Sequence, residues 1–356
     1  MQVVQVLPTI SRGDAVSNHA LAIDGVLKQH GLTTRIYAEN RDKKLPKRMA
    51  SDVRKMHALS SEDIMLYHGS TGSQLNYDLP QYGGRKAMIY HNITPPQYFE
   101  RYSRRACELV RRGYEGMRYL ADKIEYCIAD SAYNKEGLRE LGYTCRIDVC
   151  PLIIPFEDYA REPNRKVMEQ YPGDGWTNLL FVGRIAPNKK HEDIIRSFYC
   201  YRRRYNAKAR LFLVGSSGGM ECYLDDLKSY AQHLGIAEHV IFPGHIGFDE
   251  VLAYYKLADV FVCMSEHEGF CVPLVESMLF DVPIVAYAST AIPETLGGSG
   301  LLLEDKDPEY VAAAIDRVIE DEALRSHVRA TQRTRLMAFE HDVVAKRFME
   351  CIRTIA

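Results

Sequence analysis

Residues 265–277 read SEHEGFCVPLVES and join a buried strand to a helix. The apolar run over 259–264 just before them is typical of a strand in a buried parallel sheet. Pro273 suits the first turn of the helix, where a backbone amide has no partner to lose. The amides of Cys271 and Val272 then lie at the positive end of the helix dipole, which is an anion site suited to phosphate. The stretch therefore predicts a strand–loop–helix joint of an α/β protein.

Two carboxylates flank the expected phosphate site. Glu268 lies just outside it, and Glu276 lies about one turn inside the helix. Carboxylates do not bind phosphate, so they are better placed to accept hydrogen bonds from hydroxyl groups on either side of it. A sugar, a diphosphate and a ribose would fit that layout. The alternative is a surface glutamate and a helix-capping glutamate beside a buried strand.

The spacing of these two glutamates, with Gly269 and Phe270 after the first, resembles the E-x7-E motif of retaining nucleotide-sugar glycosyltransferases of family 4. The resemblance implies that Glu268 meets hydroxyls of the donor sugar and that Glu276 meets the ribose. It also implies that the donor lies along the residues between them, which are Gly269, Phe270, Cys271 and Val272.

The composition is that of a globular protein with room for two domains. The chain has 356 residues, of which 46% are hydrophobic and 26% charged. Its net charge of -2 gives no case for nucleic-acid binding. The nine cysteines form no C-x-x-C pair, which fits a reducing cytosol. We see no signal peptide and no apolar run near the ~18 residues of a membrane span, so we expect a cytoplasmic protein.

The first part of the chain begins with a strand, a loop, a helix and a second strand over residues 2–38, which predicts a right-handed βαβ unit. Its loop is not a G-x-G-x-x-G fingerprint, so an NAD site is poorly supported. In the resembled family this loop lies against the donor diphosphate and the acceptor, which makes Gly13 and Asp14 candidates. The family often has two adjacent glycines where this chain has Arg12 and Gly13. The alternative is a plain turn.

His91 ends a predicted strand over 86–91, just before a loop marked by two prolines. The carboxyl end of a strand lies on the crevice side of an open α/β sheet. Members of the resembled family commonly place a histidine there, near the donor sugar and the acceptor. The resemblance implies that role for His91; the alternative is a structural histidine.

Two basic segments stand out in the first part of the chain. One is a loop over 41–48, and the other is a predicted helix over 98–120 that is rich in arginine. A solvated surface is one interpretation of each segment. The other is contact with a phosphate-bearing acceptor or an anionic membrane surface. The cations of the loop are Arg41, Lys43, Lys44, Lys47 and Arg48.

Four prolines over 151–175 predict a linker without regular structure. We therefore expect an acceptor-side domain over 1–155 and a nucleotide-sugar domain over 156–339. Two such α/β halves imply a cleft between them, where ligands usually bind. In the resembled family the last helix crosses back to the first domain, which implies the same for 340–356.

A second anion site is predicted near the start of the second domain. Arg184 ends a strand, and Lys189 stands near the start of the next helix, so the two cations can converge on one diphosphate. The resembled family has Gly-Arg with a lysine five residues after the arginine, and holds the leaving diphosphate with them. Many members have glycine where this chain has Lys190. The alternative is a solvated basic loop.

Two further loops face the nucleotide in the resembled family. One is the glycine-rich turn that begins at Gly215, and the other is the turn at His245 and Ile246, which lies near the base. The same glycine-rich turn matches G-x-S-x-G, so a hydrolase with Ser217 as nucleophile is an alternative. That mechanism would also need an acid and a histidine later in the chain.

One acidic triplet needs its own interpretation. Asp305, Lys306 and Asp307 form a D-x-D sequence, which holds a divalent metal in another glycosyltransferase architecture. Because a proline and a helix follow, Asp307 is predicted to be an N-cap. We expect no metal and no cofactor.

The sequence thus predicts two Rossmann-like domains facing across a cleft, the GT-B type. It predicts a retaining enzyme that moves a hexose from GDP-mannose or a UDP-hexose to a glycan or lipid-linked hydroxyl, in surface polysaccharide or glycoconjugate synthesis. Arg184, Lys189 and the helix start would stabilise the leaving diphosphate without a metal. A phosphate oxygen of the leaving group could take the acceptor's proton. A further alternative is a non-catalytic subunit that binds sugar nucleotides.

Overall fold

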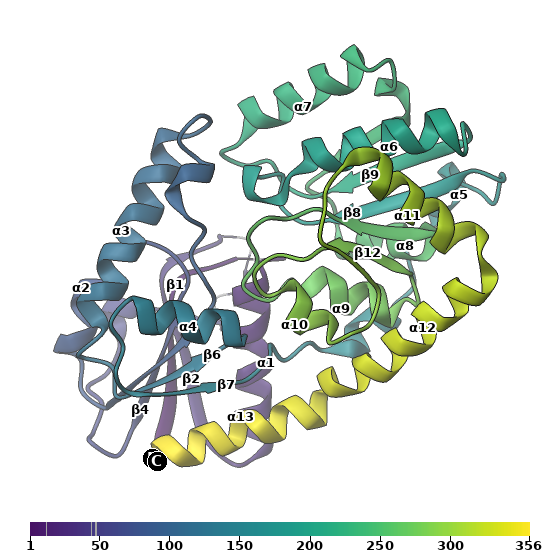
Figure 1. Cartoon of the computed structure of the whole chain (residues 1–356). Coiled ribbons are helices and arrows are strands. Elements are labelled where there is room, and N and C mark those ends of the chain that lie inside the picture. The colour runs from purple at the N-terminus through teal and green to yellow at the C-terminus, as the bar shows by residue number, and fades with distance from the viewer. Residues whose placement is uncertain (12, 44, 47) are drawn as a thin grey trace. The chain divides into compact units, whose positions relative to one another are not determined.

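The computed structural model describes residues 1–11, 13–43, 45–46 and 48–356. These residues form two compact units (Figure 1). Unit 1 comprises Met1–Gln97, Arg104–Pro155 and Phe339–Ala356, and unit 2 comprises Tyr98–Ser103 and Phe156–Ala338.

Unit 1 is built on a seven-stranded parallel sheet of order β3-β2-β1-β4-β5-β6-β7. The chain runs outward from β1 in one direction and returns to β4 on the other side, so the strand order reverses between these two strands. Such a point opens a crevice at the carboxyl ends of the strands. The strands are β1 (Gln2–Ile10), β2 (Thr33–Arg41), β3 (Ser51–Asp52), β4 (Ile64–Gly69), β5 (Arg85–Tyr90), β6 (Tyr126–Ala129) and β7 (Arg146–Val149).

Helices cover both faces of this sheet, because its strands are apolar on both sides. Val3 packs on the face of α1 (Ala15–Gln29) and α13 (His341–Ile355), which is yellow in Figure 1. Val4 points to the other face, where α2 (Leu75–Asp78), α3 (Arg104–Leu120) and α4 (Ala132–Glu140) add buried side chains. The 3-10 turns of unit 1 are Val53–Lys55 and Leu79–Gln81, and a third, Pro96–Tyr98, runs into unit 2.

Unit 2 repeats the plan with a six-stranded parallel sheet of order β10-β9-β8-β11-β12-β13. Here the order reverses between β8 and β11, so the loops after these two strands border the crevice. Pro243 lies in the edge strand β10, where a missing amide costs no ladder bond. The strands are β8 (Thr177–Val182), β9 (Ala209–Val214), β10 (Val240–Gly244), β11 (Val260–Cys263), β12 (Ile284–Tyr287) and β13 (Leu301–Leu303).

The helices of unit 2 pack in pairs as well as on the sheet; α6 packs against α11, and α9 against α12. They are α5 (Arg165–Gln170), α6 (His191–Arg204), α7 (Glu221–His233), α8 (Phe248–Leu257), α9 (Val272–Leu279), α10 (Ile292–Leu296), α11 (Pro308–Glu320) and α12 (Glu322–Leu336). No helix in the described ranges is both long enough and apolar enough to span a bilayer.

The prediction of two parallel α/β domains is confirmed, but two sequence predictions about elements are wrong. The linker over 151–175 is not free of regular structure, because it holds a 3-10 turn at Phe156–Ala160 and the helix α5. Asn164 caps α5 by accepting from two amides of its first turn, which compensates for the nearby prolines. The helix predicted over 98–120 begins only at Arg104.

Candidate functional site

The predicted donor residues of unit 2 gather at one edge of its sheet. Arg184 and Lys189 follow β8, Gly215 follows β9, and Glu268 follows β11. In a parallel sheet all these loops leave from the same edge, and β8 and β11 flank the point where the strand order reverses. The sequence therefore concentrates its charged candidates where an α/β sheet binds ligands.

Side-chain hydrogen bonds hold the loop between β11 and α9 in place. The amide of Glu268 donates to Thr290 Oγ1 over 2.9 Å. Asn188 Nδ2 donates to the carbonyl of His267 over 3.0 Å, and Thr295 Oγ1 donates to the carbonyl of Phe270. The loop is thus tied to the turn after β8 and to the segment around α10. Sequence reasoning missed Asn188, Thr290 and Thr295, because single polar residues in separate loops carry no spacing signal.

Lys189 and Glu268 form an ion pair, with Nζ 2.6 Å from Oε2. The two side chains are only 19% and 8% exposed. Burial by itself lowers the pKa of Lys189, but the Glu268 carboxylate outweighs this effect and holds the pKa above its ordinary value. Lys189 is therefore a cation at neutral pH, beside the start of α9.

The helix α9 starts from a strained residue. Cys271, its N-cap, has φ 71° and ψ 68°, which is the left-handed region that a residue with a Cβ rarely adopts. The first amides of a helix have no partner within the helix, so those of Val272 and its neighbours face the same edge of the sheet. Backbone strain of this kind tends to cluster at ligand sites. The helix begins at Val272, so Pro273 is its second residue.

Glu276 is held by two tyrosine hydroxyls. Tyr159 donates to Oε1 and Tyr255 to Oε2, each over 2.6 Å. Burial raises the pKa of Glu276, although both hydrogen bonds act in the opposite direction. Each carboxylate oxygen still has a lone pair for another hydroxyl. Sequence reasoning found Glu276 but missed both tyrosines, which come from a 3-10 turn and from α8.

Four further predicted donor residues of unit 2, Arg184, Gly215, His245 and Ile246, lie in exposed or partly buried turns. Arg184 is exposed. Two backbone hydrogen bonds join its loop to the loop after β9: the amide of Gly183 donates to the Val214 carbonyl, and the amide of Ile185 donates to the Ser216 carbonyl. A Cβ at Gly215 would lie 1.9 Å from the Gly183 carbonyl oxygen, so only glycine fits. His245 is exposed and Ile246 partly buried in the turn after β10, and their contact with a base stays a prediction.

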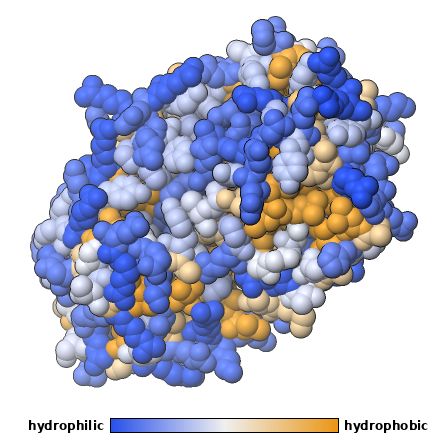
Figure 2. Space-filling model, viewed as in Figure 1, coloured by the Kyte–Doolittle hydropathy of each residue, from blue (hydrophilic) through white to orange (hydrophobic). Residues whose placement is uncertain are grey.

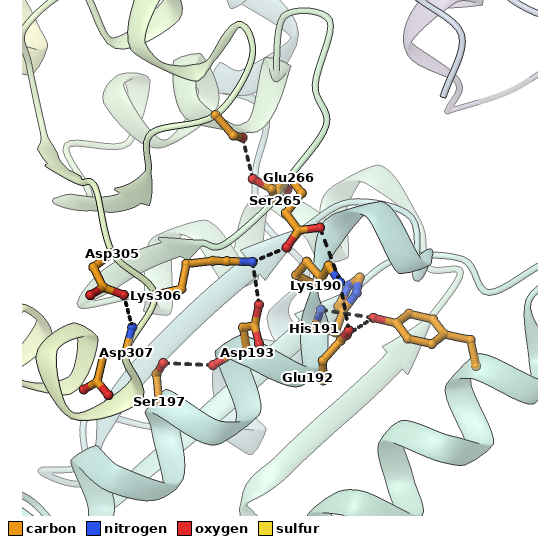
Figure 3. Close-up of polar contacts among 12 residues, drawn as sticks. Lys190, His191, Glu192, Asp193, Ser197, Ser265, Glu266, Asp305, Lys306 and Asp307 are labelled. Carbon is orange, nitrogen blue, oxygen red and sulfur yellow. Dashed lines mark hydrogen bonds and ion pairs between the residues drawn. The ribbon is translucent and has the colours of Figure 1, made fainter. Parts of the chain in front are cut away.

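A cluster of charged side chains supports the loop between β11 and α9 (Figure 3). Lys306 Nζ lies 2.8 Å from Asp193 Oδ2 and also pairs with Glu266, which comes from the β11–α9 loop. Lys190 Nζ lies 3.3 Å from Glu266 Oε2 and 3.7 Å from Glu192 Oε1. The cluster ties the loop to the start of α6 and to the segment before α11.

The acidic triplet is a structural feature of this support. Asp307 caps α11 by accepting from the amides of Glu309 and Tyr310, as predicted. Asp305 Oδ1 accepts from the amide of Asp307 over 2.9 Å. The Lys306 side chain points toward the carboxylates of Asp193 and Glu266 (Figure 3). The carboxylates of the triplet are therefore engaged in local hydrogen bonds.

The predicted residues of unit 1 follow its own strand ends. Gly13 has φ 73°, which glycine adopts freely, and Asp14 caps α1 by accepting from the amide and hydroxyl of Ser17. Asp14 thus has a structural task, and the donor contacts of Gly13 and Asp14 stay predictions. Arg12, which adjoins them, lies outside the described residues, as do Lys44 and Lys47 of the basic loop.

His91 belongs to a buried chain of polar side chains. Its Nδ1 lies 3.0 Å from Asp130 Oδ2, and its Nε2 lies 2.9 Å from His68 Nδ1. His68 Nε2 in turn lies 3.0 Å from Gln5 Oε1. Burial raises the pKa of Asp130 and lowers the pKa of His68 well below its ordinary value. The ring of His91 is therefore directed into unit 1, and its predicted contact with a donor sugar would require a change of partners.

The geometry does not support Asp259 as the acid of a Ser217 hydrolase. Ser217 follows β9 at the carboxyl edge of the sheet, whereas Asp259 precedes β11 at the opposite edge. Asp259 Oδ2 instead accepts from the amide of Asn178, over 2.7 Å. A catalytic triad needs its members within hydrogen-bond reach, but here the length of a strand separates Ser217 from Asp259.

Comparison with known proteins agrees with this geometry. Residues 172–335 match the protein family described as glycosyl transferases group 1. The chain is 32% identical over 152 residues to the uncharacterized glycosyltransferase MJ1607 of Methanocaldococcus jannaschii, a match that covers 42% of this chain and 37% of that protein. It is 24% identical over 280 residues to O-antigen chain mannosyltransferase B of Escherichia coli, covering 76% and 70%.

A third relative names its donor. The GDP-mannose-dependent alpha-(1-6)-phosphatidylinositol monomannoside mannosyltransferase of Mycobacterium tuberculosis is 29% identical over 217 residues, covering 58% of this chain and 55% of that protein. The matched segments thus span from 37% to 70% of the length of these relatives.

Solved structures match nearly the whole chain. Sucrose-phosphate synthase of Thermosynechococcus elongatus has a TM-score of 0.76 at 17% identity, covering 100% of this chain and 99% of that one. HepE of Anabaena, in complex with UDP and glucose, has a TM-score of 0.73 at 16% identity, covering 99% and 100%. At such identities the likeness shows the fold. Residues 172–335 are thus similar to the glycosyl transferases of group 1, and both units have the parallel α/β fold of GT-B glycosyltransferases.

Proposed function

We propose that this chain is a retaining hexosyltransferase of family 4, which moves a sugar from a nucleotide diphosphate donor to a hydroxyl of a glycan or a lipid-linked acceptor. The observation that carries the proposal is the buried Lys189–Glu268 pair at the reversal of strand order, next to the start of α9. A fixed cation, a carboxylate and the positive end of a helix dipole thus lie at the same edge of the sheet.

The cation and the helix start would receive the leaving diphosphate. Lys189 keeps its proton because Glu268 raises its pKa, so it offers full charge at neutral pH. Arg184, exposed earlier in the same loop, would add a fork of donors. Such preorganised charge stabilises the transition state as the bond to the sugar breaks.

The two glutamates would hold the ends of the donor. Glu268 would orient the hydroxyls of the sugar, while Glu276 would accept from the ribose with Tyr159 and Tyr255 fixing its carboxylate. A non-bridging oxygen of the leaving phosphate would take the acceptor's proton, so that the acceptor attacks from the face that the diphosphate leaves. The sugar would then keep its anomeric configuration.

The donor is a GDP- or UDP-sugar, in our proposal. A GDP-mannose-dependent mannosyltransferase among the relatives supports the first, and the complex of Anabaena HepE with UDP and glucose supports the second. A binding screen would separate them, because a ligand that binds the folded state raises the apparent melting temperature by mass action.

The acceptor is proposed to be membrane-linked or part of a surface glycan, as the names of an O-antigen and a phosphatidylinositol relative suggest. The exposed arginines of α3 would then approach anionic lipid, and Figure 2 shows mainly hydrophilic side chains over that helix. They are Arg104, Arg105, Arg111, Arg112 and Arg118. Sedimentation with anionic and with neutral vesicles tests this contact, since only the anionic ones should retain the protein.

The central experiment measures transfer from GDP-mannose and UDP-hexoses by purified protein, with product anomers assigned by NMR. Arg184→Ala, Lys189→Ala and Glu268→Ala should each abolish most turnover, whereas Arg203→Ala, which removes an exposed arginine of α6, should not. Unchanged activity in all three would refute the mechanism. Tight nucleotide binding without transfer to any acceptor would instead identify a non-catalytic subunit.

A further inference from the structure

Three histidines from three elements of unit 1 meet in its interior. His19 lies on α1, His68 on β4, and His91 directly after β5. One ring nitrogen from each lies within 4.8 Å of the others. The rings of His68 and His91 lie nearly parallel, with centroids 5.2 Å apart and nitrogen facing nitrogen, and that of His19 stands nearly perpendicular to both. Neutral imidazole nitrogens gathered in this way are the ligands that Zn²⁺ and similar ions prefer.

The outer nitrogens of two of these rings are already oriented by hydrogen bonds. Gln5 donates its amide to the Ala20 carbonyl, so its Oε1 can only accept, and His68 Nε2 must carry the proton between them. His91 Nδ1 faces a carboxylate oxygen of Asp130, so it carries the other proton. A carboxylate or carbonyl behind each histidine is the usual second layer of a metal site.

This arrangement leaves two lone pairs pointing at each other. With their outer nitrogens protonated, the neutral rings present bare nitrogens, His68 Nδ1 and His91 Nε2, only 2.9 Å apart. Two such lone pairs require a cation between them, which is either an extra proton or a metal ion. The ring of His19 favours a metal ion over a proton, because His19 is 4% exposed and neither of its nitrogens has a hydrogen-bond partner among the described residues.

We propose that His19, His68 and His91 form a binding site for one zinc-like divalent ion, with Asp130 and Gln5 as its outer partners. In a tetrahedral site with Zn–N bonds of about 2.0–2.1 Å, ligand nitrogens lie about 3.3 Å apart, so the inner pair needs to open only slightly. The ion would tie α1, β4 and the loop after β5 together. The site lies wholly within unit 1, and an ion bound there would hold the His91 ring away from the donor-sugar contact that the resemblance implies.

A second cluster in unit 2 is a weaker candidate for the same ion. Cys263, Glu268 and Cys271 also bring their ligand atoms within 4.8 Å. However, Glu268 already pairs with Lys189, whose charge would repel a second cation. The experiment therefore uses Cys271→Ser protein throughout, which removes the thiol cluster and leaves the histidines intact.

The test titrates metal-free protein with Zn²⁺ and with Co²⁺, using a chromogenic chelator for affinity and visible absorption for Co²⁺ geometry. We expect one ion per chain, a tetrahedral nitrogen-ligated Co²⁺ spectrum, and a higher melting temperature. His19→Leu should abolish the spectrum, and Asp130→Asn should lower affinity about 10–100-fold. His57→Ala, which removes an exposed histidine of the same unit, should change nothing.

The variant result is backed by a measurement on protein with all three histidines. X-ray absorption of the Zn²⁺ form should show three imidazole nitrogens around the metal. If His19→Leu fails to fold, this spectrum decides the question alone. Absence of stoichiometric binding, equal affinity in the folded His19→Leu protein, or a shell without three imidazoles would each overturn the proposal and leave a shared proton as the cation.

Discussion

Lys189 Nζ lies 2.6 Å from Glu268 Oε2, although 79 residues separate them in the chain. The pair joins the loop after β8 to the loop after β11, the two strands between which the order of the sheet reverses. Burial makes each charge depend on the other, because an ion removed from water is stable only when it is paired. The same contact thus supports the fold of unit 2 and holds two of the proposed catalytic groups.

Removing one partner of this pair should cost more stability than removing both. Lys189→Met leaves a buried carboxylate unpaired, which we expect to cost about 3–5 kcal/mol, while the Lys189→Met, Glu268→Gln double variant should recover most of that loss. Both proteins should lose about 10²–10³-fold in kcat, since the cation is absent from each. Trp176, the sequence's one tryptophan, lies in unit 2 and reports its unfolding by fluorescence.

A double variant no more stable than Lys189→Met would contradict this account of the pair. Recovery of activity together with stability would contradict the catalytic role, because it would mean that Lys189 acts only through the fold.

Glu276 should make the stability of unit 2 fall as pH rises. Burial raises its pKa above the ordinary value of 4.5, so the folded state favours the neutral acid. Its contribution is fully present below pH 4.5 and is lost as pH rises through the raised pKa. Glu276→Gln keeps a neutral group there, so its stability relative to the parent should increase between pH 4.5 and 7. Urea unfolding followed by Trp176 fluorescence at several pH values measures this, and a constant difference would show that the pKa is not raised.

Gly215 should tolerate no side chain. In Gly215→Ala the new Cβ would lie 1.9 Å from the Gly183 carbonyl oxygen, so the Gly183–Arg184 backbone must move. We expect a cost of roughly 1–3 kcal/mol and a raised KM for the donor. Ser217→Ala, two residues away, should leave both unchanged. Loss of activity in the Ser217 variant alone would revive the hydrolase alternative.

Local patterns in the sequence were enough to predict much of unit 2. The apolar run before residue 265 and the proline after it indicate β11 and α9 directly, and Asp307 is recognisable as a cap because a proline follows. The pairing of Arg184 with Lys189 in one loop also rests on short spacing. In the structure Lys189 forms an ion pair with Glu268, and Arg184 is exposed in the same loop as Lys189.

What the sequence could not show depends on contacts between distant elements. Tyr159 and Tyr255 reach Glu276 from elements that carry no motif. The three histidines come from α1, β4 and the loop after β5, and only the sheet order brings them together. The linker helix α5 was missed because prolines near both of its ends indicate an irregular segment. Its cap, Asn164, accepts hydrogen bonds from two amides of the first turn that have no partner within the helix.

Lys190 offers a test of backbone strain beside the site. Its φ of 52° and ψ of 49° lie in the left-handed region, which glycine adopts without strain and which many members of the resembled family fill with glycine. Lys190→Gly relieves a strain of roughly 1–2 kcal/mol but gives up the half-buried ion pairs with Glu266 and Glu192, each worth about 0–1 kcal/mol. Lys190→Ala gives up the same ion pairs and keeps the strain.

The glycine variant should therefore be more stable than the alanine variant by about 1 kcal/mol, the reverse of their order within a helix. Urea midpoints from Trp176 fluorescence compare the two, and the parent should lie close to the glycine protein because strain and ion pairs offset each other. An alanine protein more stable than the glycine protein would show that residue 190 leaves the left-handed region in solution, and that the turn after Lys189 is not held as described.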